Sequence, residues 1–152
     1  MITIKRILVP TDFSDQGKTA LMYAVAFADR FGAAIDLLHV LEPVPPGALL
    51  SYVSLNDLKK GMQEEAEKHL ETLHTEWNNY AFPVRKIVVE GHPFVEIIKH
   101  AKESNADMIV MGTHGRGAIA HMLLGSVAEK VVRKSPCPVL TVRHPEHEFV
   151  HP

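Results

Sequence analysis

The chain has 152 residues, 46% of them hydrophobic and 22% charged, which is enough for one globular domain and excludes an intrinsically disordered protein. Sixteen Lys and Arg residues against 18 Asp and Glu residues give a formal net charge of −2, so the chain has no bulk attraction to nucleic acid or to an anionic membrane. No apolar run approaches the ~20 residues that span a bilayer, and no apolar segment precedes Pro10 as in a secretory signal, so we expect a cytoplasmic protein.

Short apolar runs alternate along the chain with longer helical patterns. The runs that predict strands span residues 7–9, 35–40, 87–89, 108–111 and 139–142. Most of them are continuously apolar, as is typical of strands covered by helices on both faces. Apolar residues three and four positions apart predict helices over residues 15–31, over residues 55–80, in a segment that opens at Pro93, and in a segment through Val127 and Val131. This order predicts an α/β fold with a parallel sheet, in one domain of residues 1–144 followed by a tail of residues 145–152.

Several residues are suited to the ends of these helices. Ser14 is a predicted N-cap of the first helix, and Gly32 lies where a left-handed C-cap glycine belongs. Ser126 and Glu129 have the spacing of a capping box, so we expect the last helix to begin at Ser126 with its side chain as the cap.

The ends of the first and fourth predicted strands carry the residues best suited to a ligand site. The first strand runs into Asp12, and the fourth into a glycine-rich loop that contains Gly115 and Arg116. Ligands of open parallel sheets bind beyond such carboxyl ends. Glycines let the backbone approach a phosphate, and a helix N-terminus beyond them supplies unpaired N–H groups; alternatively, the glycines only make a tight strand-to-helix turn. Arg116 either neutralises a terminal phosphate or is solvated.

The better-known nucleotide signatures are absent from this loop. It has no P-loop lysine for phosphoryl transfer, and its glycines do not have the spacing of the dinucleotide fingerprint. The sequence therefore indicates a phosphate-binding site that differs from both of these motifs and has few candidate catalytic residues.

The residues from Pro10 to Ser14, the second strand through Val40, and the glycine-rich loop together resemble the universal stress protein family. The pattern Gly-x2-Gly-x9-Gly-Ser, which marks the ATP-binding branch of that family, is met by Gly112, Gly115, Gly125 and Ser126. The resemblance covers nearly the whole chain. It implies an open five-stranded parallel sheet of order 3-2-1-4-5 with helices on both faces, an adenine nucleotide alpha hydrolase-like fold.

The resemblance also implies which residues bind ATP. Asp12 would approach the nucleoside, and Val40 would meet the adenine through its backbone. The whole implied site consists of Pro10, Thr11, Asp12, Val40, Met111, Gly112, Gly115, Arg116, Gly125, Ser126 and Val127. A divalent metal such as Mg²⁺ or Mn²⁺ would bind through the phosphates, with no metal ligands from the protein. Family members commonly dimerise through the last strand, here the segment that begins at Val139 and runs to Arg143.

These observations favour an ATP-binding stress-response protein that acts as a nucleotide-dependent regulator or sensor, with unknown protein partners. Two alternatives stay open. One is a slow ATPase or phosphotransferase, for which His114, Arg116 and Asp12 are the candidate catalytic residues. The other is a nucleotide-free dimeric scaffold, in which the glycine-rich loop has only a structural role.

Overall fold

A computed structural model describes residues 1–45, 54–76, 81–115 and 124–143. The strands are β1 (Arg6–Pro10), β2 (Ala34–Leu41), β3 (Val84–Glu90), β4 (Met108–Gly112) and β5 (Val139–Val142). The helices are α1 (Asp15–Phe31), α2 (Leu55–Glu76), α3 (Pro93–Glu103) and α4 (Ser126–Lys134). Each predicted strand and helix is therefore confirmed, although the end of the second predicted helix lies outside the described residues.

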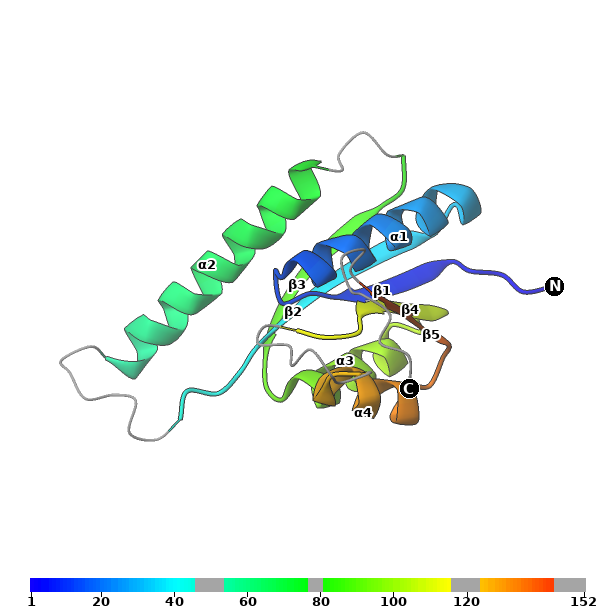
Figure 1. The fold of residues 1–152 in the computed structure, drawn as a ribbon. Coiled ribbons are helices and arrows are strands. Elements are labelled where there is room, and N and C mark those ends of the chain that lie inside the picture. The colour runs from blue at the N-terminus through cyan, green and yellow to red at the C-terminus, as the bar shows by residue number, and fades with distance from the viewer. Residues whose placement is uncertain (46–53, 77–80, 116–123, 144–152) are drawn as a thin grey trace.

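The strands form one parallel sheet of five strands in the order β3-β2-β1-β4-β5, as the resemblance implied. Helices α1 and α2 cover one face of this sheet, and α3 and α4 cover the other (Figure 1). Strands β3 and β5 are its two edges. No helix in the described part of the chain is both long and apolar enough to cross a membrane.

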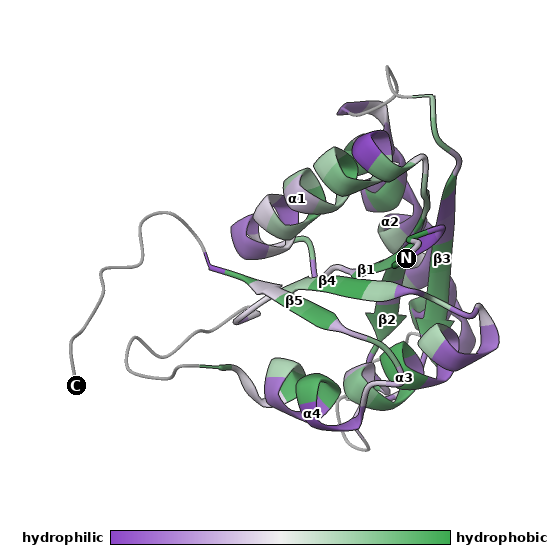
Figure 2. Ribbon diagram, turned by 90° about the vertical axis from the view of Figure 1, so that its right-hand side faces the viewer, coloured by the Kyte–Doolittle hydropathy of each residue, from purple (hydrophilic) through white to green (hydrophobic). Residues whose placement is uncertain are grey.

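Both faces of the central strands are buried, which explains why their sequences are continuously apolar. In β1, Ile7 and Val9 pack into the core beneath α1 and α2, whereas Leu8 packs beneath α3 and α4. All three side chains are inaccessible to water. Figure 2 shows these hydrophobic strands enclosed between the two helical layers. The fold is therefore stabilised by two apolar cores that share one sheet.

The ends of α1 are as predicted, but the start of α4 differs. The hydroxyl of Ser14 accepts a hydrogen bond from the N–H of Gly17 at 3.2 Å, and Gly32 has a φ of 65° at the C-cap. Helix α4 does begin at Ser126, yet the N-cap position belongs to Gly125, which has no side chain to cap the helix. The predicted capping box is therefore wrong, because Ser126 is already the first helical residue and its hydroxyl cannot act as the cap.

Candidate functional site

The centre of the sheet contains a point where two neighbouring strands send their chains to opposite faces. Strand β1 continues into α1 on one face, and β4 leads to α4 on the other. The two strands pair at Ile7–Met108 and Leu8–Ile109, before their carboxyl ends. Beyond these pairs the connections diverge, and this is where open parallel sheets bind ligands. The described residues among those predicted for the site at both strand ends lie at this point.

The end of β1 presents Asp12 at the start of α1. Thr11 is buried, its N–H donates to the carbonyl of Leu38 at 2.8 Å, and its hydroxyl accepts from the N–H of Phe13 at 3.1 Å. The Asp12 carboxylate accepts hydrogen bonds from both the N–H and the hydroxyl of Ser14. These bonds hold the Asp12 side chain at the carboxyl end of the sheet, where its oxygens can accept hydrogen bonds.

Phe13 turns the chain between β1 and α1 in a strained conformation. Its φ of 65° is uncommon for a residue with a bulky side chain. Its ring lies against His39, with centroids 4.4 Å apart, and against His69 of α2 at 4.9 Å. His39 Nδ1 in turn lies 2.8 Å from the carbonyl oxygen of Thr11, so the His39 ring is bonded to the backbone at the end of β1. Such strain is often found at ligand sites.

Backbone and side-chain hydrogen bonds hold the described part of the glycine-rich loop in place. The N–H of Thr113 donates to the Val142 carbonyl of β5 at 3.0 Å, and the Thr113 carbonyl accepts from the N–H of Gly125 at 2.7 Å. The N–H of His114 donates to Oε1 of Gln16 at 2.9 Å. The loop is thus joined to β5, to the start of α4 and to α1.

Gly115 brings the glycine-rich loop against the end of β1. A β-carbon added at Gly115 would lie 2.7 Å from Oδ2 of Asp12, closer than such contacts occur. A β-carbon at Gly125 would lie 3.2 Å from the Thr113 carbonyl oxygen. Glycine at 125 thus serves the close approach of α4 to the loop, whereas glycine at 115 lets the two predicted strand ends meet.

The N-terminus of α4 supplies hydrogen-bond donors next to this loop. The first N–H groups of a helix have no acceptor within it, and the N-cap residue here, Gly125, has no side chain that could accept from them. Ser126 is exposed in this first turn, and Val127 packs partly against the core on the α3 and α4 side. The positive end of the helix dipole adds to the attraction that this site has for an anion.

The remaining predicted site residues differ in their position and in how far they are buried. Val40 and Met111 are buried, and their side chains pack in the core beneath α3 and α4. Pro10 and Gly112 are the last residues of β1 and β4. Arg116 lies outside the described residues. His114 is buried, with Nδ1 3.1 Å from the Thr113 hydroxyl.

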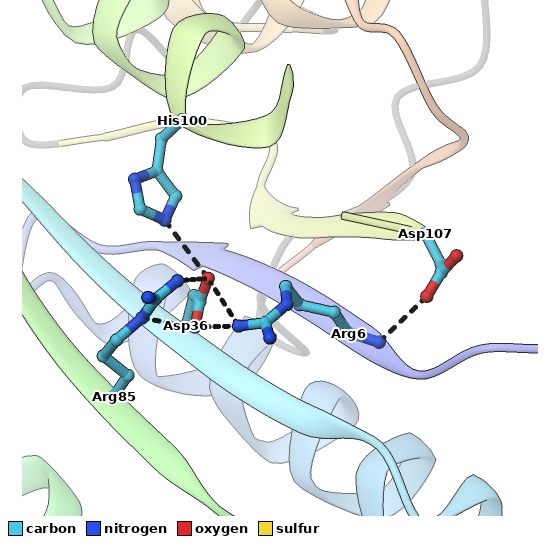
Figure 3. A network of polar contacts seen from close by, with 5 residues as sticks. All are labelled: Arg6, Asp36, Arg85, His100 and Asp107. Carbon is cyan, nitrogen blue, oxygen red and sulfur yellow. Dashed lines mark hydrogen bonds and ion pairs between the residues drawn. The ribbon is translucent and has the colours of Figure 1, made fainter. Parts of the chain in front are cut away.

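Sequence reasoning missed a buried charge network on the α3 and α4 face of the sheet. The carboxylate of Asp36, a β2 residue that is 0% exposed, contacts Arg6 of β1 at 3.1 Å, Arg85 of β3 at 2.7 Å and His100 of α3 at 3.1 Å (Figure 3). Burial alone raises the pKa of Asp36, but hydrogen bonds from Arg85 and His100 and the charges of both arginines hold it below its ordinary value.

The network lies toward the amino end of the strands, away from the glycine-rich loop. Asp36 is in register with Leu8 on one side and Arg85 on the other. Nearby, Asp107 accepts the N–H groups of Lys5 and Arg6 at 2.8 and 2.9 Å and so joins the start of β4 to that of β1. The sequence signal that could have indicated this network is Asp36 itself, a charged residue inside an apolar strand. A buried carboxylate requires cationic partners, so such a residue predicts an ion pair.

The described residues contain no group of three or more His, Cys, Asp or Glu side chains arranged to hold a metal ion. The histidines of the predicted tail fall outside the part of the chain that the structure describes.

Comparison with known proteins assigns the chain to a family. The model of the universal stress protein family matches residues 3–143. The universal stress protein MJ0577 of Methanocaldococcus jannaschii is 36% identical over 156 residues, which cover 93% of this chain and 96% of that protein. Its solved structure superimposes with a TM-score of 0.83 at 36% identity and covers 95% of this chain and 99% of its own.

Two further solved structures agree with this assignment. The universal stress protein UspA from Lactobacillus plantarum is 27% identical, with a TM-score of 0.82 and coverage of 93% of this chain and 99% of its own. A universal stress protein solved in complex with cAMP shares the fold, with a TM-score of 0.72, 24% identity and coverage of 92% and 97%. The chain therefore belongs to the universal stress protein family.

Proposed function

Starting from its membership of the universal stress protein family, we propose that this protein binds ATP where β1 and β4 diverge and acts as a nucleotide-dependent regulator or sensor in a stress response. The observation that carries the proposal is the contact between Gly115 and the Asp12 carboxylate, beside an uncapped helix N-terminus. It brings an acceptor and a set of N–H donors to one place at the carboxyl end of the sheet.

The chemistry of the two sides fits the two ends of a nucleotide. The Asp12 carboxylate is an acceptor suited to the hydroxyl groups of a ribose. The N–H groups of the glycine-rich loop and of the first turn at Ser126 are donors suited to phosphate oxygens. A universal stress protein with the same fold is described in complex with cAMP, an adenine nucleotide, which supports this class of ligand. A divalent metal, Mg²⁺ or Mn²⁺, would be held through the phosphates.

The described residues favour binding over hydrolysis. A general base must reach the proton of an attacking water. Of the candidates, the Asp12 carboxylate already accepts two hydrogen bonds from Ser14, and His114 is buried against Thr113. We therefore rank the slow ATPase below the regulator. In the proposed regulator ATP orders the loop, and partner proteins bind the ordered surface.

The proposal extends to assembly and location. Strand β5 is an edge strand whose residues Val139, Leu140 and Thr141 are only half-buried within one chain. Unpaired apolar edges invite pairing with another strand, so we propose a homodimer through Val139 to Arg143. We place the protein in the cytoplasm, where ATP is available.

The experiment that tests the proposed function is analysis of the nucleotide released from purified protein by denaturation, together with a thermal melt in added ATP. ATP near one molecule per chain supports tight binding without rapid turnover, whereas ADP or AMP favours the ATPase. Saturating ATP at 100 times Kd should stabilise the fold by about 2.7 kcal/mol. An empty protein whose melting temperature does not respond to ATP would leave the dimeric scaffold as the better explanation.

A further inference from the structure

Gln16 connects the two sides of the proposed nucleotide site. It is the second residue of α1, the helix that follows β1, and is half-buried. Its Oε1 accepts the N–H of His114, which belongs to the loop that follows β4, at 2.9 Å. The bond therefore spans the point where the chains leaving β1 and β4 diverge toward opposite faces of the sheet.

The first turn of α1 also packs closely on the start of the loop. A β-carbon added at Gly112 would lie 3.1 Å from the Gln16 β-carbon and 3.3 Å from its carbonyl carbon. These contacts place Gln16 within reach of His114. The Gln16 side chain can thus accept the loop N–H without leaving its helix.

This bond fixes the direction of the peptide group between Thr113 and His114, and the next peptide group follows directly from that fixed point. With its N–H turned toward α1, the carbonyl oxygen of His114 lies back toward Gly112, 3.3 Å from the place of a β-carbon there. In a trans peptide the N–H points opposite to the C=O. The N–H of Gly115 therefore points away from Gly112.

Two other bonds that hold the start of the loop to neighbouring elements are made by backbone groups. Thr113 bonds through its N–H to Val142 and through its carbonyl to Gly125. Such bonds do not depend on side chains, whereas the His114 bond depends on an acceptor at position 16. Because one carbonyl-type oxygen satisfies that bond, a neutral amide holds the loop without adding a negative charge beside the phosphates.

From these contacts we propose that Gln16 is a positioning residue for phosphate binding: it holds the glycine-rich loop in the orientation that presents the Gly115 N–H to the ligand. This inference rests on the proposed nucleotide-binding function. It assigns to the first turn of α1 a role at the phosphate end of the ligand, although Asp12, four residues earlier, faces the nucleoside end.

The test uses three variants of the full chain. Gln16→Met keeps the length of the side chain but removes the acceptor. Gln16→Glu keeps an acceptor oxygen at the same reach. Gln63→Met is the matched control, because Gln63 lies on α2 and bonds to Glu67 one turn along the same helix, at 2.7 Å. We would measure hydrogen exchange of the His114 amide by NMR, and the affinities for ATP and adenosine by calorimetry.

We expect Gln16→Met to lose the exchange protection of the His114 amide and to bind ATP about tenfold more weakly, a factor that corresponds to ~1.4 kcal/mol. Its affinity for adenosine should stay within about twofold of the wild type, because adenosine has no phosphates for the loop to bind. Gln16→Glu should restore the exchange protection. Gln63→Met should resemble the wild type in every measurement.

The outcomes separate this inference from the proposed function. If wild-type protein binds neither ATP nor adenosine, the proposed function fails. If wild-type protein binds ATP and Gln16→Met binds it equally well, only the role of Gln16 is overturned. Equal losses of ATP and adenosine affinity would also overturn it, because they would indicate general damage to the fold. If Gln16→Met does not fold, His114 exchange in Gln16→Glu decides: an unprotected amide there overturns the inference.

Discussion

Replacement of Asp36 by Asn tests how the charge network beneath α3 stabilises the fold. The substitution keeps the size of the side chain and removes its charge. The carboxylate has five hydrogen-bond contacts, which come from Arg6, Arg85 and His100 at distances between 2.7 and 3.3 Å. In the variant, one of the two oxygens becomes an NH₂ group that faces guanidinium donors and can accept nothing from them.

The cost follows from the exposure of each partner. Loss of one partner from a buried ion pair costs about 3–5 kcal/mol, because the other charge is left without compensation. Here the side chains of Arg6 and Arg85 are 35% and 55% exposed, so water screens them once the carboxylate is gone. We therefore expect Asp36→Asn to lower the free energy of unfolding by about 3 kcal/mol, at the lower end of that range. Arg85→Gln should cost less than about 1 kcal/mol, since more than half of Arg85 is in solvent.

Asp36→Leu separates the charge from the packing. Leucine would add to the apolar core beneath α3 and α4, and both arginines can turn to water. Replacement of buried ion pairs by apolar groups is often neutral or stabilising, so we expect Asp36→Leu to cost less than Asp36→Asn. Urea unfolding at pH 7, monitored by circular dichroism without nucleotide, gives both values as shifts of the midpoint.

The pH dependence provides an independent measure. The folded pKa of Asp36 lies below its unfolded value, so its contribution to stability is fully present above an unfolded pKa of about 3.9. The contribution is lost as the pH falls through the lower folded pKa. The stability difference between wild type and Asp36→Leu should therefore shift in favour of the variant below about pH 4. An Asp36→Asn cost under about 1 kcal/mol, or a larger cost for leucine than for asparagine, would refute the reasoning.

Three further variants test the candidate site and its surroundings. Gly115→Ala places a β-carbon 2.7 Å from Asp12 Oδ2 and should displace that carboxylate. The ATP affinity measured by calorimetry should then fall about tenfold or more. Unchanged affinity would show that the loop lies outside the ligand site. Ser126→Ala removes no cap, since the N-cap is Gly125. The free energy of unfolding without nucleotide should therefore stay within about 0.5 kcal/mol of wild type, while ATP affinity falls. A loss of stability near 1 kcal/mol would mean that the hydroxyl caps the helix after all. Leu140→Lys puts a charge on edge strand β5. If the proposed dimer forms through this strand, light scattering should show a monomer for the variant, a result that a persistent dimer would contradict.

The fold was largely predictable because its signals are local. Continuous apolar runs predicted buried strands, and residues such as Ser14 and Gly32 marked helix ends through their own backbone preferences. The capping box failed for a different reason. Ser126 and Glu129 have the correct spacing, but whether a serine is the cap or the first helical residue depends on the backbone of Gly125, which sequence spacing does not determine.

The candidate site was predictable only where motif spacing carries information. Gly112, Gly115 and Gly125 were identified by their pattern, and the structure adds that Gly115 meets Asp12. The roles of Asp36 and Gln16 depend on partners that lie far away in the sequence. His100 is 64 residues from Asp36, and His114 is 98 residues from Gln16. No periodicity within one element indicates such pairs; they follow from the order of the strands in the sheet.

The charge network of Asp36 and the proposed ligand site are expected to act independently, because they lie at different positions along the strands. Asp36 pairs in register with Leu8, whereas Asp12 lies four residues further along the same chain. At about 3.3 Å per residue, the charge network lies about 13 Å from the proposed ligand site along the strand direction. Substitutions at that separation usually add without coupling. Asp36→Asn should therefore lower stability with little effect on ATP affinity, and Gly115→Ala should do the reverse. The double variant should show the sum of the two effects; a coupling above about 0.5 kcal/mol would mean that nucleotide binding and the charge network are linked through β1 and β2.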